Sequence, residues 1–326
     1  MSYATARRVD FREIPLIDLA PAREGGEGLA GVAAAVRRAA IEVGFFYVTG
    51  HEVPEAIVRD AYAVSRRFFE RPLEEKLRVP VNARHRGFIR TGEAKMYAQA
   101  KPDLKESFIF GLDLPESDPD VCAGKSLMGP NMWPADMPEM KVALDRYYAA
   151  VTRAGEPLLR AFAVALALDP EFFVGRYAKP LSRGSIIWYP PQPPQLGAEQ
   201  FGVAPHSDYG CLTLLSQDSN GGLQVRNRAG EWVAAPPVEG SFVVNIGDLL
   251  ARWTNDLFVS TPHRVVNTSG RARQSIALFY DPHYDTMIET LPSCLAPGET
   301  PRYPPTTCGE YVKGRFDAAF KYRARA

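Results

Sequence analysis

The sequence contains few cysteines and no excess of charge of either sign. Four cysteines, Cys122, Cys211, Cys294 and Cys308, stand far apart among 326 residues, and none belongs to a CxxC pair. This spacing argues against a disulfide scaffold and against a zinc ribbon, so we expect reduced thiols. The sequence has 38 basic residues (Lys and Arg) and 38 acidic residues (Asp and Glu), so its formal net charge is zero. This balance gives no reason to expect nucleic acid or an anionic membrane as a partner.

Long apolar runs are also absent from the sequence. No stretch reaches the roughly 18 apolar residues that a membrane-spanning helix requires. The N-terminal segment MSYATARRVDFREIPLIDLA lacks both the apolar stretch of about 7 to 15 residues and the small-residue cleavage site of a secretory signal. These absences favour a cytoplasmic protein. Because 46% of the residues are hydrophobic, we still expect a large core, organised as one compact unit.

The first half of the sequence predicts a mixture of strands and helices. Residues 14–19 and the aromatic and β-branched segment 44–51 are typical of short buried strands, with helical apolar spacing between and after them. Residues 82–136 lose clear periodicity and are expected to form long ordered loops. Residues 137–168 predict a long helix, rich in Ala and Leu, that packs against a sheet.

The second half predicts a β structure. Seven short β-like runs, punctuated by Gly, Pro, Asn and Asp, follow one another at regular intervals: SIIWYP, CLTLLSQD, GLQVRN, EWVAAPP, SFVVNIGDLL, RVVNTS and RQSIALFYDP. This pattern is typical of a sandwich or jelly roll. We therefore expect a fold that is mainly β with α, including a mixed α/β N-terminal region.

Two polar residues shortly before the second β-like run are candidate metal ligands. His206 and Asp208 are two positions apart, so on a strand their side chains point to the same side. The chain has five histidines, and His263, directly before another β-like run, is the best candidate for a third ligand. Two histidines and a carboxylate suit non-haem Fe(II), with three coordination positions left open, and also suit zinc with an activated water. A solvated strand face with an unrelated loop histidine is the alternative.

An arginine and a serine follow the last of these histidines. Arg273 lies ten residues after His263, and Ser275 is two positions further on, on the same face of an expected strand. A guanidinium fork and a hydroxyl together suit a carboxylate ligand. Alternatively, Arg273 is one of the surface arginines, since the segment GRARQS contains two.

The combined pattern resembles the isopenicillin N synthase-like branch of the Fe(II)/2-oxoglutarate-dependent dioxygenases. His206-x-Asp208, 54 intervening residues, His263 and then Arg273-x-Ser275 carry the resemblance. It extends over nearly the whole chain, in family order, through IPLIDL, GFFYVTGH, FFERPLEEKL, DLKESFIFG, WYPP, HSDYGCLTLL, GGLQV, VNIGDLL, STPHRV and RQSIALFYDP.

The resemblance implies a fold and its division along the chain. The core would be a double-stranded β-helix (jelly roll) flanked by helices, with residues 180–285 binding Fe(II) and 2-oxoglutarate. Residues 13–120 would be the N-terminal helical and strand region of the dioxygenase. Residues 1–326 would then form a single catalytic unit.

The resemblance also implies roles for individual residues. The implied iron ligands are His206, Asp208 and His263. The residues implied to hold the distal carboxylate of 2-oxoglutarate are Arg273, Ser275 and Tyr189, although Tyr189 is also compatible with a core aromatic. Near the substrate, the implied position is Phe279. The irregular segment at the open end of the barrel adds Arg90, Tyr97 and Phe108 as candidates, with a solvated loop side chain as the alternative for Arg90.

The implied activity is that of an oxidoreductase. It would couple decarboxylation of 2-oxoglutarate to the hydroxylation, desaturation or cyclisation of a small molecule by dioxygen. Ascorbate is a candidate reductant. The protein would be a monomer or a weak dimer. An oxidase of the isopenicillin N synthase type, an ethylene-forming type and a catalytically silent carboxylate-binding barrel are alternatives. The C-terminal segment FDAAFKYRARA lacks the Gln-containing tail of isopenicillin N synthase, which argues against that oxidase. A zinc hydrolase would leave Arg273-x-Ser275 unexplained.

Overall fold

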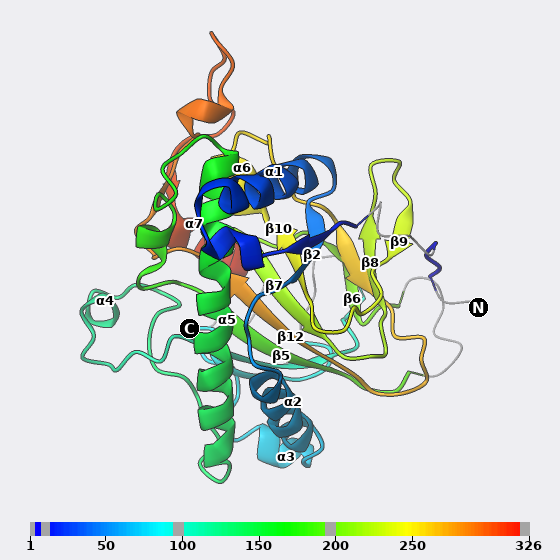
Figure 1. The fold of residues 1–326 in the computed structure, drawn as a ribbon. Helices are drawn as coiled ribbons and strands as arrows, with labels where there is room; N and C mark the ends of the chain where they lie inside the picture. The colour runs from blue at the N-terminus through cyan, green and yellow to red at the C-terminus, as the bar shows by residue number, and fades with distance from the viewer. Residues whose placement is uncertain (1–3, 8–13, 94–100, 193–199, 320–326) are drawn as a thin grey trace.

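The computed structural model describes residues 4–7, 14–93, 101–192 and 200–319 (Figure 1). Its α-helices are α1 (Gly26–Glu42), α2 (Glu55–Phe69), α3 (Leu73–Lys76), α4 (Pro119–Cys122), α5 (Pro138–Ala165), α6 (Asp248–Trp253) and α7 (Cys308–Ala319). Short 3-10 helices cover Ala20–Arg23, Val174–Tyr177 and Pro292–Cys294. Its strands are β1 (Leu16–Asp18), β2 (Phe45–Thr49), β3 (Gly87–Ile89), β4 (Glu106–Gly111), β5 (Arg183–Tyr189), β6 (Val203–His206), β7 (Leu212–Gln217), β8 (Leu223–Arg226), β9 (Trp232–Ala234), β10 (Phe242–Ile246), β11 (His263–Val265), β12 (Arg273–Tyr280), β13 (Met287–Ile288) and β14 (Thr306–Thr307).

Two sheets form the centre of the molecule. The larger has the strand order β1-β2-β10-β7-β12-β5-β4-β3, and the smaller has the order β6-β11-β8-β9. Neighbouring strands of the described ranges pair antiparallel in both sheets, except for the parallel pair β1 and β2. An apolar cluster that includes Tyr189 and Val243 of the larger sheet and Val225 and Val265 of the smaller joins their facing sides. This is the expected jelly-roll core.

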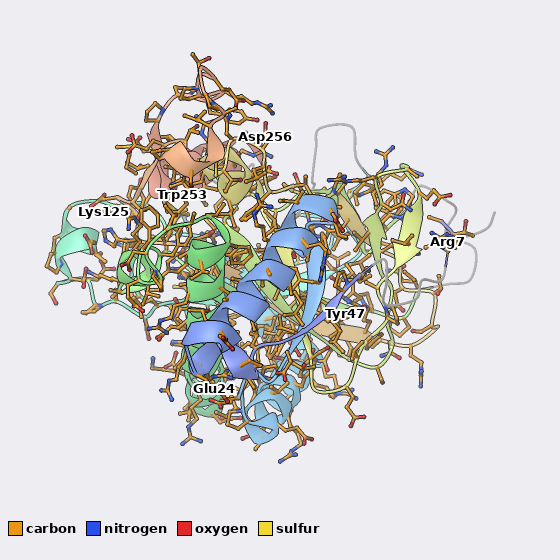
Figure 2. All side chains as sticks on the ribbon, turned by 45° about the horizontal axis from the view of Figure 1, so that its top comes forward. Arg7, Glu24, Tyr47, Lys125, Trp253 and Asp256 are labelled. Carbon is orange, nitrogen blue, oxygen red and sulfur yellow. The ribbon has the colours of Figure 1, made fainter. Side chains whose placement is uncertain are left out.

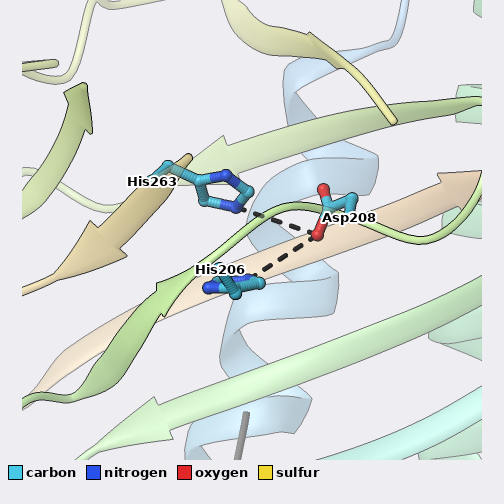
Figure 3. A group of neighbouring side chains, drawn as sticks. All are labelled: His206, Asp208 and His263. Carbon is cyan, nitrogen blue, oxygen red and sulfur yellow. Dashed lines mark ion pairs between the residues drawn. The ribbon is translucent and has the colours of Figure 1, made fainter. Parts of the chain in front are cut away.

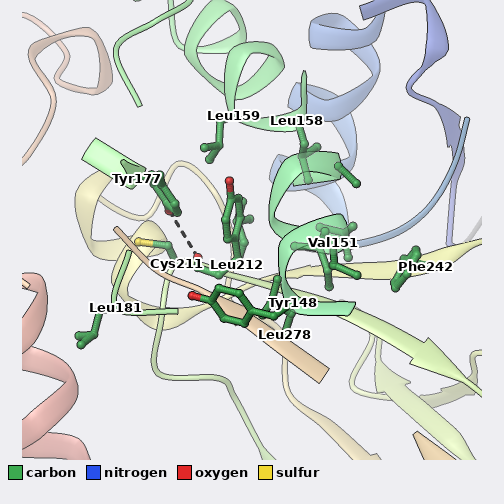
Figure 4. Close-up of a cluster of buried hydrophobic side chains, with 14 of the residues drawn as sticks. Tyr148, Val151, Leu158, Leu159, Tyr177, Leu181, Cys211, Leu212, Phe242 and Leu278 are labelled. Atoms are coloured by element: carbon green, nitrogen blue, oxygen red, sulfur yellow. Dashed lines mark hydrogen bonds between the residues drawn. The ribbon is translucent and has the colours of Figure 1, made fainter. Parts of the chain in front are cut away.

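Helices cover the other face of the larger sheet. Figure 1 shows α1 and the long α5 crossing in front of it, with α2 near the lower end of α5. In Figure 4, Val151 and Leu158 of α5 lie above Leu212 and Leu278 of the sheet, within one apolar cluster. Alternation along the strands separates this cluster from the interior of the jelly roll. In β2, for example, Phe46 faces the helices, whereas its neighbour Phe45 faces the smaller sheet.

The expected long helix and several strands are confirmed, but the expected loop region is partly wrong. The predicted helix 137–168 corresponds to α5. Within 82–136, however, the structure contains β3, β4 and the short α4. β4 lies between β3 and β5 and pairs with β5 from Glu106 to Gly111. Its partner comes from more than seventy residues later in the chain, so the short alternation in KESFIFG was not enough by itself to predict this strand.

None of the helices in the described ranges combines the length and the apolar character needed to cross a membrane.

One glycine of α5 marks a close contact between helix and sheet. A Cβ at Gly155 would lie 2.5 Å from Cε1 of Tyr280, a ring that is 1% exposed and whose hydroxyl donates to the Thr152 carbonyl at 3.1 Å. We expect Gly155→Ala to lower the free energy of unfolding by about 1 kcal/mol or more, because overpacking outweighs the gain in helix propensity. Denaturant unfolding followed by circular dichroism measures the change.

Gly31 provides the matched control for that substitution. It lies in α1, and a Cβ there would meet nothing within 4 Å. Gly31→Ala should therefore raise the free energy of unfolding by up to about 1 kcal/mol. If both variants were stabilised equally, the contact between α5 and β12 would not be as tight as described.

Candidate metal centre

Three side chains from the smaller sheet and the loop beside it form a compact group. His206 ends β6 and His263 begins β11, and the two residues are directly paired across the strands. Each Nε2 lies 3.7 Å from Oδ1 of Asp208, and dashed lines mark these two pairs in Figure 3. The candidate ligand atoms are all within 4.8 Å of one another. Such separations suit ligands that each lie about 2 Å from one shared ion.

The expectation that His206 and Asp208 share a strand is wrong. β6 ends at His206, and Asp208 lies in the loop that leads to β7. The backbone carbonyl of Asp208 accepts a hydrogen bond from the Asp248 N–H at 2.7 Å instead of joining a strand ladder. The loop also passes so close to Gly247 that a Cβ there would overlap the Gly210 carbonyl oxygen. This tight crossing, rather than strand alternation, orients the carboxylate.

The Asp208 carboxylate is held by two neutral donors. Thr213 Oγ1 and Asn245 Nδ2 both donate to Oδ2, at 2.5 and 2.8 Å, and leave Oδ1 facing the two imidazoles. Burial by itself would raise the pKa of the Asp208 carboxyl. The nearby His263 and His206, together with these hydrogen bonds, nevertheless lower that pKa below its usual value. The group is therefore a carboxylate at neutral pH, as a metal ligand has to be.

The imidazoles are oriented by backbone carbonyls. Nδ1 of His206 lies 2.8 Å from the Ala204 carbonyl oxygen, and Nδ1 of His263 lies 3.3 Å from that of Thr261. With Nδ1 protonated, each ring donates to its carbonyl and presents the lone pair of Nε2 to the centre of the group. Burial, followed by the neighbouring His263, lowers the pKa of His206 well below its usual value, so the His206 ring is neutral.

A buried arginine lies at the start of β12. Arg273 is 1% exposed, and its guanidinium donates to the Gly221 carbonyl, to Ser275 Oγ at 3.3 Å and to Gln217 Oε1 at 3.2 Å. The ring of Tyr189 lies 4.6 Å from the guanidinium carbon. Within the described ranges, no carboxylate comes within ion-pair distance of Arg273. A buried cation with only neutral partners is costly, so this position is suited to binding an anion.

A cavity opens beside the metal-ligand group. Its volume is about 770 Å³ including the open mouth, and His206 and Asp208 form part of its wall. The remaining wall combines β4, β5 and β12 with the C-terminal helix α7, through residues such as Ser107, Arg183 and Phe316. Two of the three candidate ligands, His206 and Asp208, therefore lie in the wall of a concave site, and such sites typically bind small organic molecules.

The substrate candidates from the sequence have different positions. Phe279 lines the cavity. Phe108 does not, because it is fully buried on the helix-facing side of β4, whereas its neighbours Ser107 and Ile109 face the cavity. Arg90 is also outside the cavity wall; it is largely exposed and pairs with Glu93 at 2.8 Å. Tyr97 lies outside the described residues.

Several cavity residues were missed from the sequence. Lys105, Arg183 and His85 all line the cavity. His85 is 5% exposed, and its ring centroid lies 4.4 Å from that of Phe316 of α7. The alternation of Lys105, Ser107 and Ile109 in the segment KESFIFG was the available signal for a strand with one face toward a site. No local signal placed α7 there.

A second group of candidate ligand atoms is already neutralised. Asp120, His283 and Asp285 also come within 4.8 Å of one another. However, Lys125 pairs with both carboxylates and Lys179 pairs with Asp120. Figure 2 shows Lys125 on the peripheral loop around α4. We interpret this group as an ion-pair network and not as a metal centre.

Comparisons with known proteins agree with this geometry. Residues 14–136 match the family model described as non-haem dioxygenase in morphine synthesis N-terminal, and residues 171–282 match that of the 2OG-Fe(II) oxygenase superfamily. A 2-oxoglutarate-Fe(II) type oxidoreductase of Emericella nidulans is 34% identical over 319 residues, covering 94% of this chain and 90% of the relative. A homoarginine-6-hydroxylase of Glycine max is 37% identical over 298 residues, covering 86% and 89%.

A solved structure shares the fold over almost the whole chain. A full-length Neurospora crassa protein, crystallised in complex with alpha-KG and thymine, has a TM-score of 0.84 and 30% identity, and the match covers 95% of this chain and 98% of that one. Alpha-KG is 2-oxoglutarate. These similarities support the superfamily more firmly than the narrower isopenicillin N synthase-like branch. The chain therefore belongs to the 2OG-Fe(II) oxygenase superfamily, and it is a 2-oxoglutarate-dependent oxidoreductase of small molecules.

Proposed function

We propose that the chain binds Fe(II) through His206, Asp208 and His263 and that Arg273 binds the distal carboxylate of 2-oxoglutarate. The observation that carries the proposal is the buried guanidinium of Arg273, whose partners within the described ranges are uncharged. A dicarboxylate would supply the missing anion with one end and reach the metal with the other. A zinc hydrolase has no need of this second site.

Ser275 and Tyr189 complete the proposed co-substrate site. Ser275 lies on the same face of β12 as Arg273, is 1% exposed and already contacts the guanidinium. Tyr189 pairs with Arg273 across β5 and β12, and its ring packs on the guanidinium. Both contacts fix the direction of the arginine fork, so that little conformational freedom is lost when a carboxylate binds.

The residues of the chain position and shield the reacting groups. Bound Fe(II) would supply the oxidising chemistry, in which dioxygen and 2-oxoglutarate give succinate, CO2 and an oxidised substrate. Thr213 and Asn245 hold one carboxylate oxygen of Asp208, which leaves the other free for the metal. Phe279 and Ile187 provide apolar cavity wall that excludes water beside it.

Anaerobic absorption spectroscopy tests the proposal. Wild-type protein loaded with Fe(II) is expected to develop a weak visible charge-transfer band when 2-oxoglutarate is added, because the co-substrate chelates the metal. Zn(II) in place of Fe(II) is the control and should give no band. A protein that binds iron but shows no band would favour an oxidase that does not use 2-oxoglutarate.

Other features of the function stay predictions. The oxidation can be a hydroxylation, a desaturation or a cyclisation, and the relatives named above do not choose the substrate, since homoarginine is a cationic amino acid and thymine a neutral base. Ascorbate as reductant, a monomeric or weakly dimeric state and a cytoplasmic location were predicted from the sequence or the resemblance. The same holds for the division into residues 13–120 and 180–285 within a single catalytic unit.

A further inference from the structure

Each of two cations in the cavity wall is paired with a buried carboxylate. Lys105 directly precedes β4, Arg183 begins β5, and both line the cavity. In the pairing of these two strands Arg183 lies opposite Gly111, at the end of β4 that is remote from Lys105. Nζ of Lys105 lies 3.5 Å from Oδ2 of Asp103, and Nη2 of Arg183 lies 3.1 Å from Oδ2 of Asp281. Each cation therefore has its own anion, in a different part of the wall.

The other oxygen of each carboxylate accepts a hydrogen bond from the backbone. Oδ1 of Asp103 accepts from the Ala204 N–H at 3.0 Å. Oδ1 of Asp281 accepts from the Cys211 N–H at 2.7 Å. Residues 204–211, here called the ligand segment, carry two of the three candidate metal ligands. Two buried carboxylates thus hold the ligand segment, one at each end.

At its first end, the ligand segment is held next to the carbonyl that orients His206. Ala204 donates its N–H to Asp103, and its carbonyl oxygen lies 2.8 Å from Nδ1 of His206. The Asp103 side chain is 1% exposed, and the neighbouring Leu104 N–H donates to the Phe201 carbonyl at 3.0 Å. A displacement of Ala204 would therefore move the group that sets the direction of the imidazole.

At its second end, the ligand segment is held close to Asp208. Asp281 is 0% exposed and lies directly against the loop, since a Cβ at Gly210 would overlap its Oδ1. The carbonyl of Asp208 is bound by the Asp248 N–H at the start of α6, whereas the N–H of Cys211 is bound by Asp281. The position of the Asp208 carboxylate therefore depends on both contacts of its loop.

The two cations stabilise the carboxylates that hold the ligand segment. Burial raises the pKa of both the Asp103 and the Asp281 carboxyl, and the charges of Lys105 and Arg183 oppose this rise. The cations thus favour the ionised carboxylates, whose hydrogen bonds are about twice as strong as those of neutral groups. The guanidinium of Arg183 is itself fixed by the ring of Phe316, whose centroid lies 4.9 Å from the guanidinium carbon.

We propose, on the basis of the proposed function, that Asp103 and Asp281 are positioning residues for the metal centre. By holding the ligand segment at its two ends, they fix the imidazole of His206 and the carboxylate of Asp208 before the metal binds. Ligands that are already held in place lose less conformational freedom on binding, so the affinity for the metal is higher. The cations of the cavity wall then serve the metal centre indirectly, through their carboxylates.

Co(II) binding to the full-length protein tests the proposal. This ion takes the same ligands as Fe(II), and its visible absorption reports the coordination geometry. Asp103→Ala and Asp281→Ala are each expected to lower the Co(II) affinity about 10- to 100-fold, the usual loss when a residue that orients a metal ligand is substituted. The absorption bands of bound Co(II) should also change, because the ligands are no longer held in one geometry.

Asparagine substitutions keep the proposal testable if an alanine variant does not fold. An asparagine retains an acceptor oxygen for the backbone N–H but lacks the charge. Asp103→Asn and Asp281→Asn should therefore bind Co(II) at least about threefold more weakly than wild type and more tightly than the corresponding alanine variants. Circular dichroism establishes which variants are folded.

Glu106→Ala is the matched control. Glu106 also belongs to a buried ion pair, with Lys76 at 2.6 Å, but it does not line the cavity. Its substitution removes the acid of a buried pair, as the aspartate variants do, and should lower the stability of the fold while the Co(II) affinity stays that of wild type.

The outcomes separate this inference from the proposed function. Wild-type Co(II) affinity in folded Asp103→Ala and Asp281→Ala would overturn the inference and leave the proposed function intact. An equal loss of affinity in Glu106→Ala would also overturn it, because general destabilisation would then explain the result. If the wild-type protein bound neither Co(II) nor Fe(II), the proposed function would be wrong, and the inference with it.

Discussion

Asp208→Ala is expected to abolish Fe(II) binding and, with it, all oxidation of 2-oxoglutarate. The substitution removes the only carboxylate of the three candidate ligands and leaves two imidazoles facing a divalent cation. Loss of a residue that merely orients a ligand costs about 10- to 100-fold in metal affinity, so loss of the ligand itself should cost more than about 100-fold. Iron content after gel filtration, and succinate release under dioxygen, measure the two effects.

The second cluster of candidate metal ligands, formed by Asp120, His283 and Asp285, supplies the control for that experiment. Asp120→Asn alters the cluster with His283 and Asp285, which Lys125 and Lys179 already neutralise. We expect its iron content and activity to match wild type. Iron loss in Asp120→Asn with iron retained in Asp208→Ala would show that the metal centre has been placed in the wrong cluster.

Arg273→Met is expected to weaken 2-oxoglutarate binding by about 100-fold while iron binding persists. Truncation of one partner of a buried, hydrogen-bonded charge pair costs about 2–5 kcal/mol in binding, which corresponds to factors of about 30 to several thousand. The effect should appear in the concentration of 2-oxoglutarate needed to form the charge-transfer band. The neighbouring Arg271 is exposed, so Arg271→Met should leave this concentration unchanged.

Stability distinguishes a binding role of Arg273 from a structural one. Without 2-oxoglutarate, the guanidinium is buried among neutral partners, and a methionine of similar length removes its desolvation cost. The free energy of unfolding of ligand-free Arg273→Met should therefore equal or exceed that of wild type, whereas the stabilisation by added 2-oxoglutarate should be lost. A large destabilisation of the ligand-free variant would instead indicate a structural role.

Local sequence patterns predicted the elements that are locally determined. The helix 137–168 has its own apolar periodicity, and the β-like runs after Gly184 alternate or are continuously apolar, so both are present with small shifts of their ends. β4 was missed because its stability depends on pairing with β5, far away in the chain. The loop at Asp208 was predicted as a strand because the crossing with Gly247 has no signature in the segment HSDYG.

The sequence predicted part of the candidate site, as it predicted part of the fold. Residue types and spacing indicated the His206, Asp208 and His263 group, and the structure brings these side chains together. Phe108 was misplaced because its face of β4 depends on the register with β5, and a shift by one residue would exchange Phe108 for Ser107 in the cavity wall. The cations Lys105 and Arg183 of the cavity wall come from separate segments of the chain, and only the tertiary fold brings both segments to this cavity.

The cavity wall includes segments of the chain that lie outside residues 180–285, and this has an evolutionary consequence. The candidate metal ligands and Arg273 come from the segment β6 to β12, whereas Ser107 belongs to β4, which precedes that segment, and Phe316 belongs to α7, which follows it. Mutations in those outer segments can reshape what the cavity accepts without touching the oxidation machinery. Descendants of one ancestral gene can in this way acquire new substrates while they inherit the same reaction.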